Sequence, residues 1–196
     1  MELCNLISMA TVEYLKSAKR QFLYYKTLGE KAMAQVDDAG LNWQTNEESN
    51  SIAVIVKHLW GNMLSRWTDF LTTDGEKPGR QRDAEFQNDW KGRDFIVQKW
   101  EEGWKCLFGA LESITDDDLN KIIYIRNEGH TILEAINRQL AHYPYHVGQM
   151  IYIAKMLQNE NWQSLSIPRN KSNDYNADKF SQDKGIRHFT DSELKK

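Results

Sequence analysis

Two histidines are the first residues of this chain whose types and spacing could do chemistry. His142 and His146 lie four positions apart in segment 135–154, where apolar residues recur at helical spacing. A helix has about 3.6 residues per turn, so both imidazoles lie on one side of it, a turn apart. Neutral imidazoles bind divalent zinc, nickel, copper or iron. The pair indicates a transition-metal site, with ordinary surface pairing of two histidines as the alternative.

Two residues between the histidines bear on that chemistry. Tyr143 follows His142, at the position where the helical zinc proteases carry a catalytic glutamate, so the pattern disfavours such a protease. Pro144 is unusual inside a helix, because proline removes a backbone hydrogen bond and costs about 3 kcal/mol there. Such a local violation is typical of functional sites. Alternatively the helix ends and a new one begins at Pro144, and the histidines then need not align.

Composition limits the class of protein. The 196 residues include 40% hydrophobic residues and seven Trp, enough for one domain with a sizeable core. A net charge of −3 disfavours nucleic acid and anionic membrane as partners. Cys4 and Cys106 form neither a disulfide framework nor a metal knuckle, and neither shares a helix stripe with a histidine. Without a signal peptide or a long apolar run, we expect a cytoplasmic protein.

The hydrophobic periodicity predicts an all-α protein. Helices are expected over about 6–28, 52–72, 85–111 and 132–157, the last opened by a Thr131-x-x-Glu134 capping box. Four helices of about 20 residues with long connections indicate a four-helix bundle with long crossovers, over residues 1–160. Residues 161–196 are expected to form a C-terminal tail that packs partly on the bundle through Trp162, Leu165 and Ile167.

Bundles build metal sites between facing helices, so a third ligand should come from another helix. His58 on the second helix is the best candidate, although a solvent-satisfied surface histidine is the alternative. His130 lies about 120° round the helix from His142, and His188 lies in the tail. Helical arithmetic groups His58, Asn62, Ser65 and Asp69 in one stripe, and Arg138, His142, His146 and Gln149 in another. Both stripes flank an apolar arc, which predicts a cleft at the rim of the bundle.

Three segments carry a family resemblance: Ile55–Met63 around His58, Arg66–Pro78 after it, and Ala135–Gln149 around the histidine pair. The chain resembles the DinB/YfiT-like superfamily, and most closely an uncharacterised subgroup with the tail motif Trp-Gln-Ser-Leu-Ser-Ile-Pro-Arg at 162–169. The resemblance implies a four-helix bundle, usually dimeric, that binds one divalent metal (zinc, nickel or iron) through His58, His142 and His146. It also brings thiol-dependent transferases into consideration.

Three functions remain open from the sequence. The first is a metal-dependent enzyme, such as a thiol-dependent transferase or a hydrolase, in which three imidazoles leave positions for water or a small thiol substrate. Asn62, Arg66, Arg138 and Gln149 are then expected to bind the substrate, an anionic one oriented by the arginines. Ion pairs of the arginines within the bundle are the alternative. The second is a non-catalytic, metal-binding or stress-associated dimeric scaffold, and the third is a homodimeric bundle without metal. The chain contains no Glu-x-x-His pair, which disfavours a di-iron site.

Overall fold

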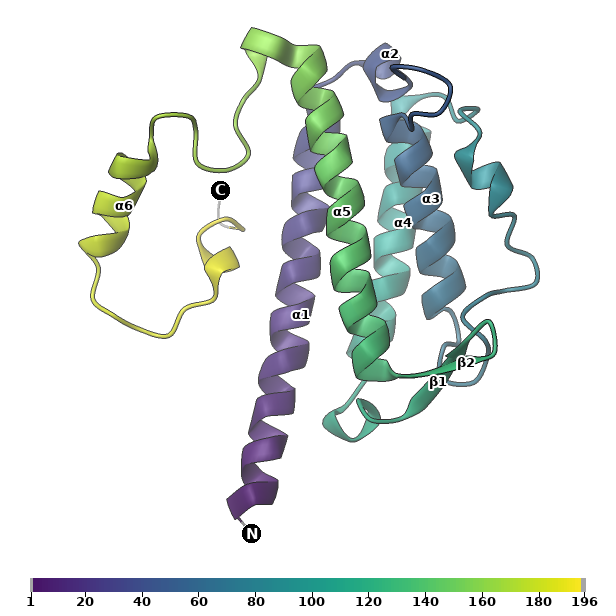
Figure 1. Cartoon of the computed structure of the whole chain (residues 1–196), viewed down its shortest axis with the longest axis vertical. Helices are drawn as coiled ribbons and strands as arrows, with labels where there is room; N and C mark the ends of the chain where they lie inside the picture. Colours follow the sequence, from purple (N-terminus) through teal and green to yellow (C-terminus); the bar gives the residue numbers. More distant parts are fainter. Residues whose placement is uncertain (1, 195–196) are drawn as a thin grey trace.

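The computed structural model describes residues 2–194, without the side chains of residues 2–13 and 116. Four long helices lie side by side (Figure 1): α1 (Glu2–Ala34), α3 (Ile52–Trp67), α4 (Arg93–Glu112) and α5 (Ile132–Gln158). The shorter elements are α2 (Asp38–Leu41), α6 (Ser172–Phe180), β1 (Ile122–Ile125), β2 (Glu128–Thr131) and the single 3₁₀ turns η1 (Asp83–Phe86), η2 (Asp116–Asp118), η3 (Asn159–Asn161) and η4 (Phe189–Asp191). The predicted helical bundle is confirmed. No described helix has the length and hydropathy that a membrane span requires.

The connection between α3 and α4 is the long crossover of the bundle. Both helices begin at the end where α1 finishes (Figure 1). For α4 this follows from its first residue, Arg93, which donates from Nη1 to the carbonyl of Met33 at 2.9 Å. The chain from Trp67 to Arg93 therefore runs back along the bundle, as Figure 1 shows. α3 packs mainly on α4, and α1 mainly on α5. This pairing leaves α3 and α5 facing each other across the histidines.

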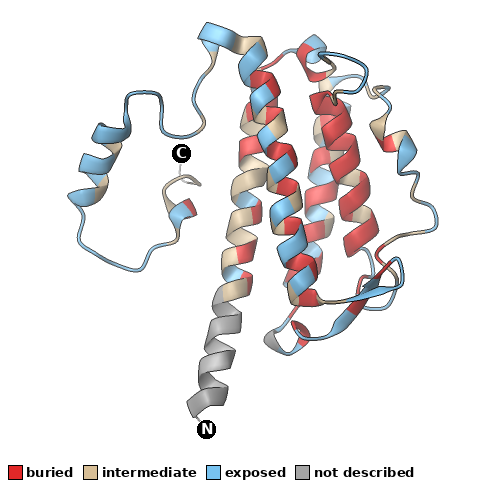
Figure 2. Cartoon of the chain, in the orientation of Figure 1, coloured by how far each residue is buried: buried red, intermediate tan, exposed pale blue. Residues whose placement is uncertain are grey.

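Aromatic side chains fill the centre of the bundle. Trp104 lies with its ring centroid 5.3 Å from that of Trp100, 5.7 Å from Tyr143 and 6.3 Å from Phe22, and all four side chains are buried. Each such side chain contributes about 1.5–3 kcal/mol by leaving water. The buried residues follow the inward faces of the long helices, and α3 is buried almost throughout (Figure 2).

Three predicted helix boundaries are wrong. The first helix was expected to end at about Leu28, but α1 continues to Ala34. The third helix was expected to start at Glu85, but that residue belongs to the 3₁₀ turn η1, and α4 begins only at Arg93. Gly92 has a φ of 83°, which a helix cannot continue through, and Phe86 packs on His58 of α3 instead of on a helical neighbour. The second helix ends at Trp67, before the predicted Thr72, because Thr68 is extended and Asp69 has a φ of 46°.

A β-hairpin, which the sequence did not predict, leads into α5. β1 and β2 pair antiparallel, and the two turn residues Arg126 and Asn127 have φ of 56° and 62°, a type I′ turn. Asp74, in the crossover, accepts the backbone N–H groups of these two residues at 2.8 and 2.9 Å. These backbone hydrogen bonds lower the pKa of Asp74. The hairpin thus fastens the start of α5 to the loop that follows α3.

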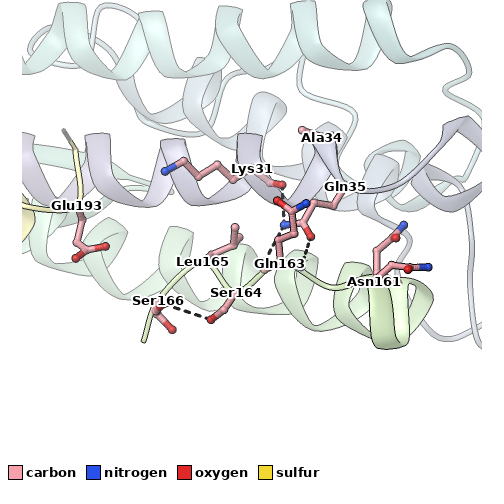
Figure 3. A pocket seen from close by; sticks show the side chains of 10 residues that line it. Lys31, Ala34, Gln35, Asn161, Gln163, Ser164, Leu165, Ser166 and Glu193 are labelled. Atoms are coloured by element: carbon pink, nitrogen blue, oxygen red, sulfur yellow. Dashed lines mark hydrogen bonds between the residues drawn. The ribbon is translucent and has the colours of Figure 1, made fainter. Parts of the chain in front are cut away.

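The segment after α5 returns along α1. Figure 3 shows Gln35, directly after α1, paired with the backbone of Gln163 through hydrogen bonds of 2.9 and 3.1 Å, beside a cavity of about 720 Å³. Trp162 and Leu165 pack half-buried against the core. The expected burial of Ile167 is wrong, since that side chain is 43% exposed. Further on, His188 Nε2 lies 3.0 Å from Ser17 Oγ of α1.

Gly29 offers a test of the packing between α1 and α4. A Cβ atom at this position would lie 2.5 Å from Cζ2 of the buried Trp100 ring. We expect Gly29→Ala to lower the free energy of unfolding by about 1–3 kcal/mol in urea titrations, because the core is overpacked. Gly109→Ala is the matched control, since a Cβ there meets nothing within 4 Å, and it should stabilise by about 1 kcal/mol. Equal effects of the two variants would contradict the packing described above.

Candidate metal site

Three imidazoles converge between α3 and α5. Nε2 of His142 lies 3.3 Å from Nε2 of His58 and 3.1 Å from Nε2 of His146. One ligand nitrogen from each histidine lies within 4.8 Å of the other two. His58 and His146 are buried, and His142 is half-buried. The structure therefore brings together the three histidines that the sequence had proposed as a ligand set.

The separations match the requirements of one divalent ion. Two nitrogens that each lie about 2.0–2.1 Å from a zinc ion at a tetrahedral angle are about 3.3 Å apart. The observed separations of 3.1 and 3.3 Å agree with that value. The group of histidines could hold a metal ion.

The other ring nitrogen of each histidine faces an oxygen. Nδ1 of His58 lies 2.9 Å from Oε2 of Glu85, Nδ1 of His142 lies 3.2 Å from Oε1 of Gln139, and Nδ1 of His146 lies 3.2 Å from Oε1 of Gln149. An oxygen acceptor places the ring proton on Nδ1, so each Nε2 carries a lone pair. Three lone pairs that face one another repel, and a cation among them removes that repulsion. The donor set therefore fits a metal, and the oxygens have the role of the outer-shell partners of metal-binding histidines.

Glu85 is the residue that holds His58. Its carboxylate is buried and also accepts from Arg80, with Nε to Oε1 at 2.7 Å and Nη2 to Oε2 at 2.9 Å. Burial alone would raise the pKa of Glu85, but the hydrogen bonds from His58 and Arg80 outweigh it and lower the pKa. Gly61 of α3 lets the carboxylate approach, because a Cβ there would overlap Oε1 and come within 2.8 Å of Cδ. Phe86 stacks on the His58 ring with centroids 5.0 Å apart.

Burial also keeps the histidines of α5 neutral. It lowers the pKa of His142 to about 3, with help from the neighbouring His146 and His58, and it lowers the pKa of His146 to about 4. At neutral pH both rings are therefore uncharged, which is the form that binds a metal.

The helix α5 continues through Pro144 without a break, so the alternative that it ends there is wrong. Next to the proline, the buried Tyr143 hydroxyl donates to Asn62 Oδ1 at 3.0 Å and accepts from Trp67 Nε1 at 3.1 Å. Both partners lie on α3. These hydrogen bonds fix α5 against α3 at the level of the histidines, which is why His142 and His146 align with His58.

The four residues expected to orient a substrate are in different surroundings. Asn62 is buried and bonded to Tyr143. Arg66 is buried and donates to the Gly75 carbonyl and to Glu76, at 3.2 Å for the latter. Arg138 is exposed, a turn before His142, and Gln149 holds His146. Of the four, Gln149 lies in contact with a histidine of the cluster.

Sequence reasoning missed the residues that orient the imidazoles. Gln139 lies three positions before His142, a helical spacing that could have identified it. Glu85 and Phe86 come from a 3₁₀ turn that the sequence assigned to a helix, and no local signal links them to His58. His130 and His188 lie outside the cluster, in β2 and beside η4. Burial raises the pKa of the Cys106 thiol, and the Cys4 side chain lies outside the described residues.

One known protein family matches most of this chain. The family model for proteins of unknown function DUF1572 matches residues 9–171. The chain belongs to the DUF1572 family. A search of curated proteins found no match. The matched range includes all three histidines and Glu85, so the candidate metal site lies within the region that the family model matches.

The lowered histidine pKa values predict a pH dependence of stability in the metal-free protein. In the unfolded chain a histidine has a pKa of about 6.5, so it binds a proton that folded His142 and His146 do not bind. The free energy of unfolding should therefore fall as the pH is lowered from about 7 to about 4. Urea titrations across this range should show a shallower fall for His142→Asn than for wild type. His130→Asn is the control, and a slope unchanged by the His142 substitution would contradict the prediction.

Proposed function

We propose that this DUF1572 protein is a metal-dependent enzyme, a transferase or hydrolase of small molecules, in which His58, His142 and His146 hold one divalent ion. The convergence of three Nε2 atoms whose Nδ1 atoms are all engaged carries this proposal. Three protein ligands leave at least one coordination position for a substrate or water, whereas structural zinc sites use four. When bound, the ion would supply Lewis acidity.

The protein's own residues support that chemistry by orienting and covering the imidazoles. Glu85, Gln139 and Gln149 each hold an Nδ1 proton and so keep each Nε2 free. Phe86 covers one face of the His58 ring, and Arg82 lies over Phe86 with its guanidinium carbon 5.2 Å from the ring centroid. On this proposal Gln149 and Arg138 lie where they can meet a substrate, while Asn62 and Arg66 position the helix and the crossover.

The resemblance to the DinB/YfiT-like superfamily supports the same function. In that superfamily one histidine of the second helix and two of the last helix bind the metal, and thiol-dependent transfer is among the reactions. We extend the proposal accordingly to a small thiol as co-substrate, to zinc, nickel or iron as the metal, and to a homodimer as the assembly. Sedimentation mass at tens of micromolar tests the assembly.

Metal content tests the ligand set directly. After dialysis against excess Zn²⁺ and then against buffer, we expect elemental analysis to find one ion per chain in wild type. His58→Ala, His142→Ala and His146→Ala should each lose most of it, because two imidazoles remain. His130→Ala is the control of the same residue type and should retain the ion. Thermal melts establish that each variant is folded. A wild type without metal, or three variants that retain it, would refute the proposal.

The outer partners of His58 give a second test. Metal-binding sites typically lose about 10–100-fold in affinity when the partner of a ligand histidine is removed. We expect a loss of that order for Glu85→Gln and for Gly61→Ala, whose Cβ would displace the Glu85 carboxylate. Competition with a chelator measures the affinity. Asp89→Asn is the control, because Asp89 binds Lys57 and no histidine. Unchanged affinity in both variants would show that Glu85 does not hold the ligand in place.

A further inference from the structure

A groove runs along α5 on the C-terminal side of the histidines. Its volume is about 590 Å³, within the range of small-molecule sites. One wall is the loop before α3, with Trp43 and Asn50, and the other is α5, with Tyr145, Tyr152 and Met156. These three α5 side chains are 63%, 65% and 42% exposed. Large apolar groups scattered singly over a surface need no explanation, but here they line one concave surface.

The groove borders the metal site at His146. Gln149 lines it and accepts from Nδ1 of His146. Tyr145 lines it as well, and its ring centroid lies 5.0 Å from that of His146. From Gln149 to Met156 the groove extends about 10 Å along the helix axis. The groove therefore begins against His146 and extends away from it along α5.

The charges of the groove restrict what it can hold. Among the described residues that line it, Glu48 is the one charged side chain, and it is acidic. The cations predicted to orient an anionic substrate lie elsewhere. Arg66 is buried against Glu76 and the Gly75 carbonyl, and Arg138 is about 16 Å from Gln149 along α5. An anionic group in the groove would meet a carboxylate and no cation, whereas aromatic or aliphatic groups would pack on the tyrosines and Met156.

We propose that this groove binds the uncharged, aromatic or aliphatic part of the substrate whose reacting end lies at the histidines. The inference rests on the proposed function, because it names the substrate class of the same site. For the part of the substrate that lies in the groove, it replaces the expected anionic group oriented by Arg66 with a neutral, apolar one. Asn50 and Gln149, which also line the groove, carry amide groups that can hydrogen-bond to polar atoms of the substrate.

Gly148 makes the groove testable without damage to the fold. It lies in α5 and lines the groove, and a Cβ built on it meets nothing within 4 Å. A large side chain at this position therefore extends into the groove, not into the core. Gly148→Trp should block the groove and leave the histidines in place, and Gly148→Ala is the matched control.

The experiment uses imidazoles as probes on the full-length protein loaded with Co²⁺, followed by visible absorption. The probes are 1-methylimidazole, 1-benzylimidazole and 1-(4-carboxybenzyl)imidazole, which share a metal-binding nitrogen and differ in the group that would enter the groove. We expect 1-benzylimidazole to bind about tenfold more tightly than the other two, as burial of an aromatic ring predicts. Gly148→Trp should abolish that advantage and leave 1-methylimidazole within about twofold of wild type, and Gly148→Ala should change neither.

The outcomes separate the groove from the metal site. The groove inference would be overturned, while the metal proposal stands, if the three probes bound with equal affinity. It would also be overturned if 1-benzylimidazole still bound more tightly than the other probes in Gly148→Trp. A change of sedimentation mass in Gly148→Trp with no change in probe affinity would overturn it too, and would make the groove an interface between copies of the chain. If no Co²⁺ binds, the proposed function fails. Amide NMR shifts of Asn50 and Gly148 with millimolar 1-benzylimidazole then decide the groove on metal-free protein, and their absence would refute it.

Discussion

The hydrogen bond between Glu85 and His58 is the contact on which the arrangement of this protein depends. It joins two buried side chains, a carboxylate and an imidazole, at 2.9 Å. A buried charge costs several kcal/mol unless its partners are well placed. Arg80 supplies two further charge-assisted hydrogen bonds, so the carboxylate is satisfied on both oxygens. The crossover must therefore return to α3 at Gly61, and it brings Phe86 onto the His58 ring as it does so.

The position of α5 depends on a second set of polar contacts. Tyr143 bonds Asn62 and Trp67 of α3 inside the core, and Asp74 holds the hairpin turn that precedes α5. The Tyr143 hydrogen bonds fix the position of α5 along α3, and the Asp74 hydrogen bonds fix the hairpin that leads into its N-terminus. The helix continues through Pro144, so both histidines lie on the same face of α5. The separations between the Nε2 atoms follow from these constraints on the backbone.

His58 and His146 are buried, whereas the groove beside His146 is open to solvent. Desolvation of His142 and His146 keeps the rings neutral at physiological pH, and it follows from packing between α3 and α5. The groove beyond Gln149 is open, and its α5 wall carries Tyr152, Ile153 and Met156. A largely buried histidine cluster beside an accessible groove is the arrangement that the proposed small-molecule enzyme needs, because electrostatic interactions strengthen where water is excluded.

Local patterns were sufficient to predict the helical bundle and the three histidines. Periodicity of 3.6 residues places His142 and His146 on one face, and the Thr131-x-x-Glu134 box that opens α5 depends on adjacent residues only. The type I′ hairpin was missed, since its Arg-Asn turn lacks the usual glycine. Glu85 was misassigned to a helix because its partners, His58 and Arg80, are brought to it by the fold of the crossover. Spacing along a helix follows from backbone geometry, whereas a contact between residues 27 positions apart in the chain exists only once the crossover has folded onto α3.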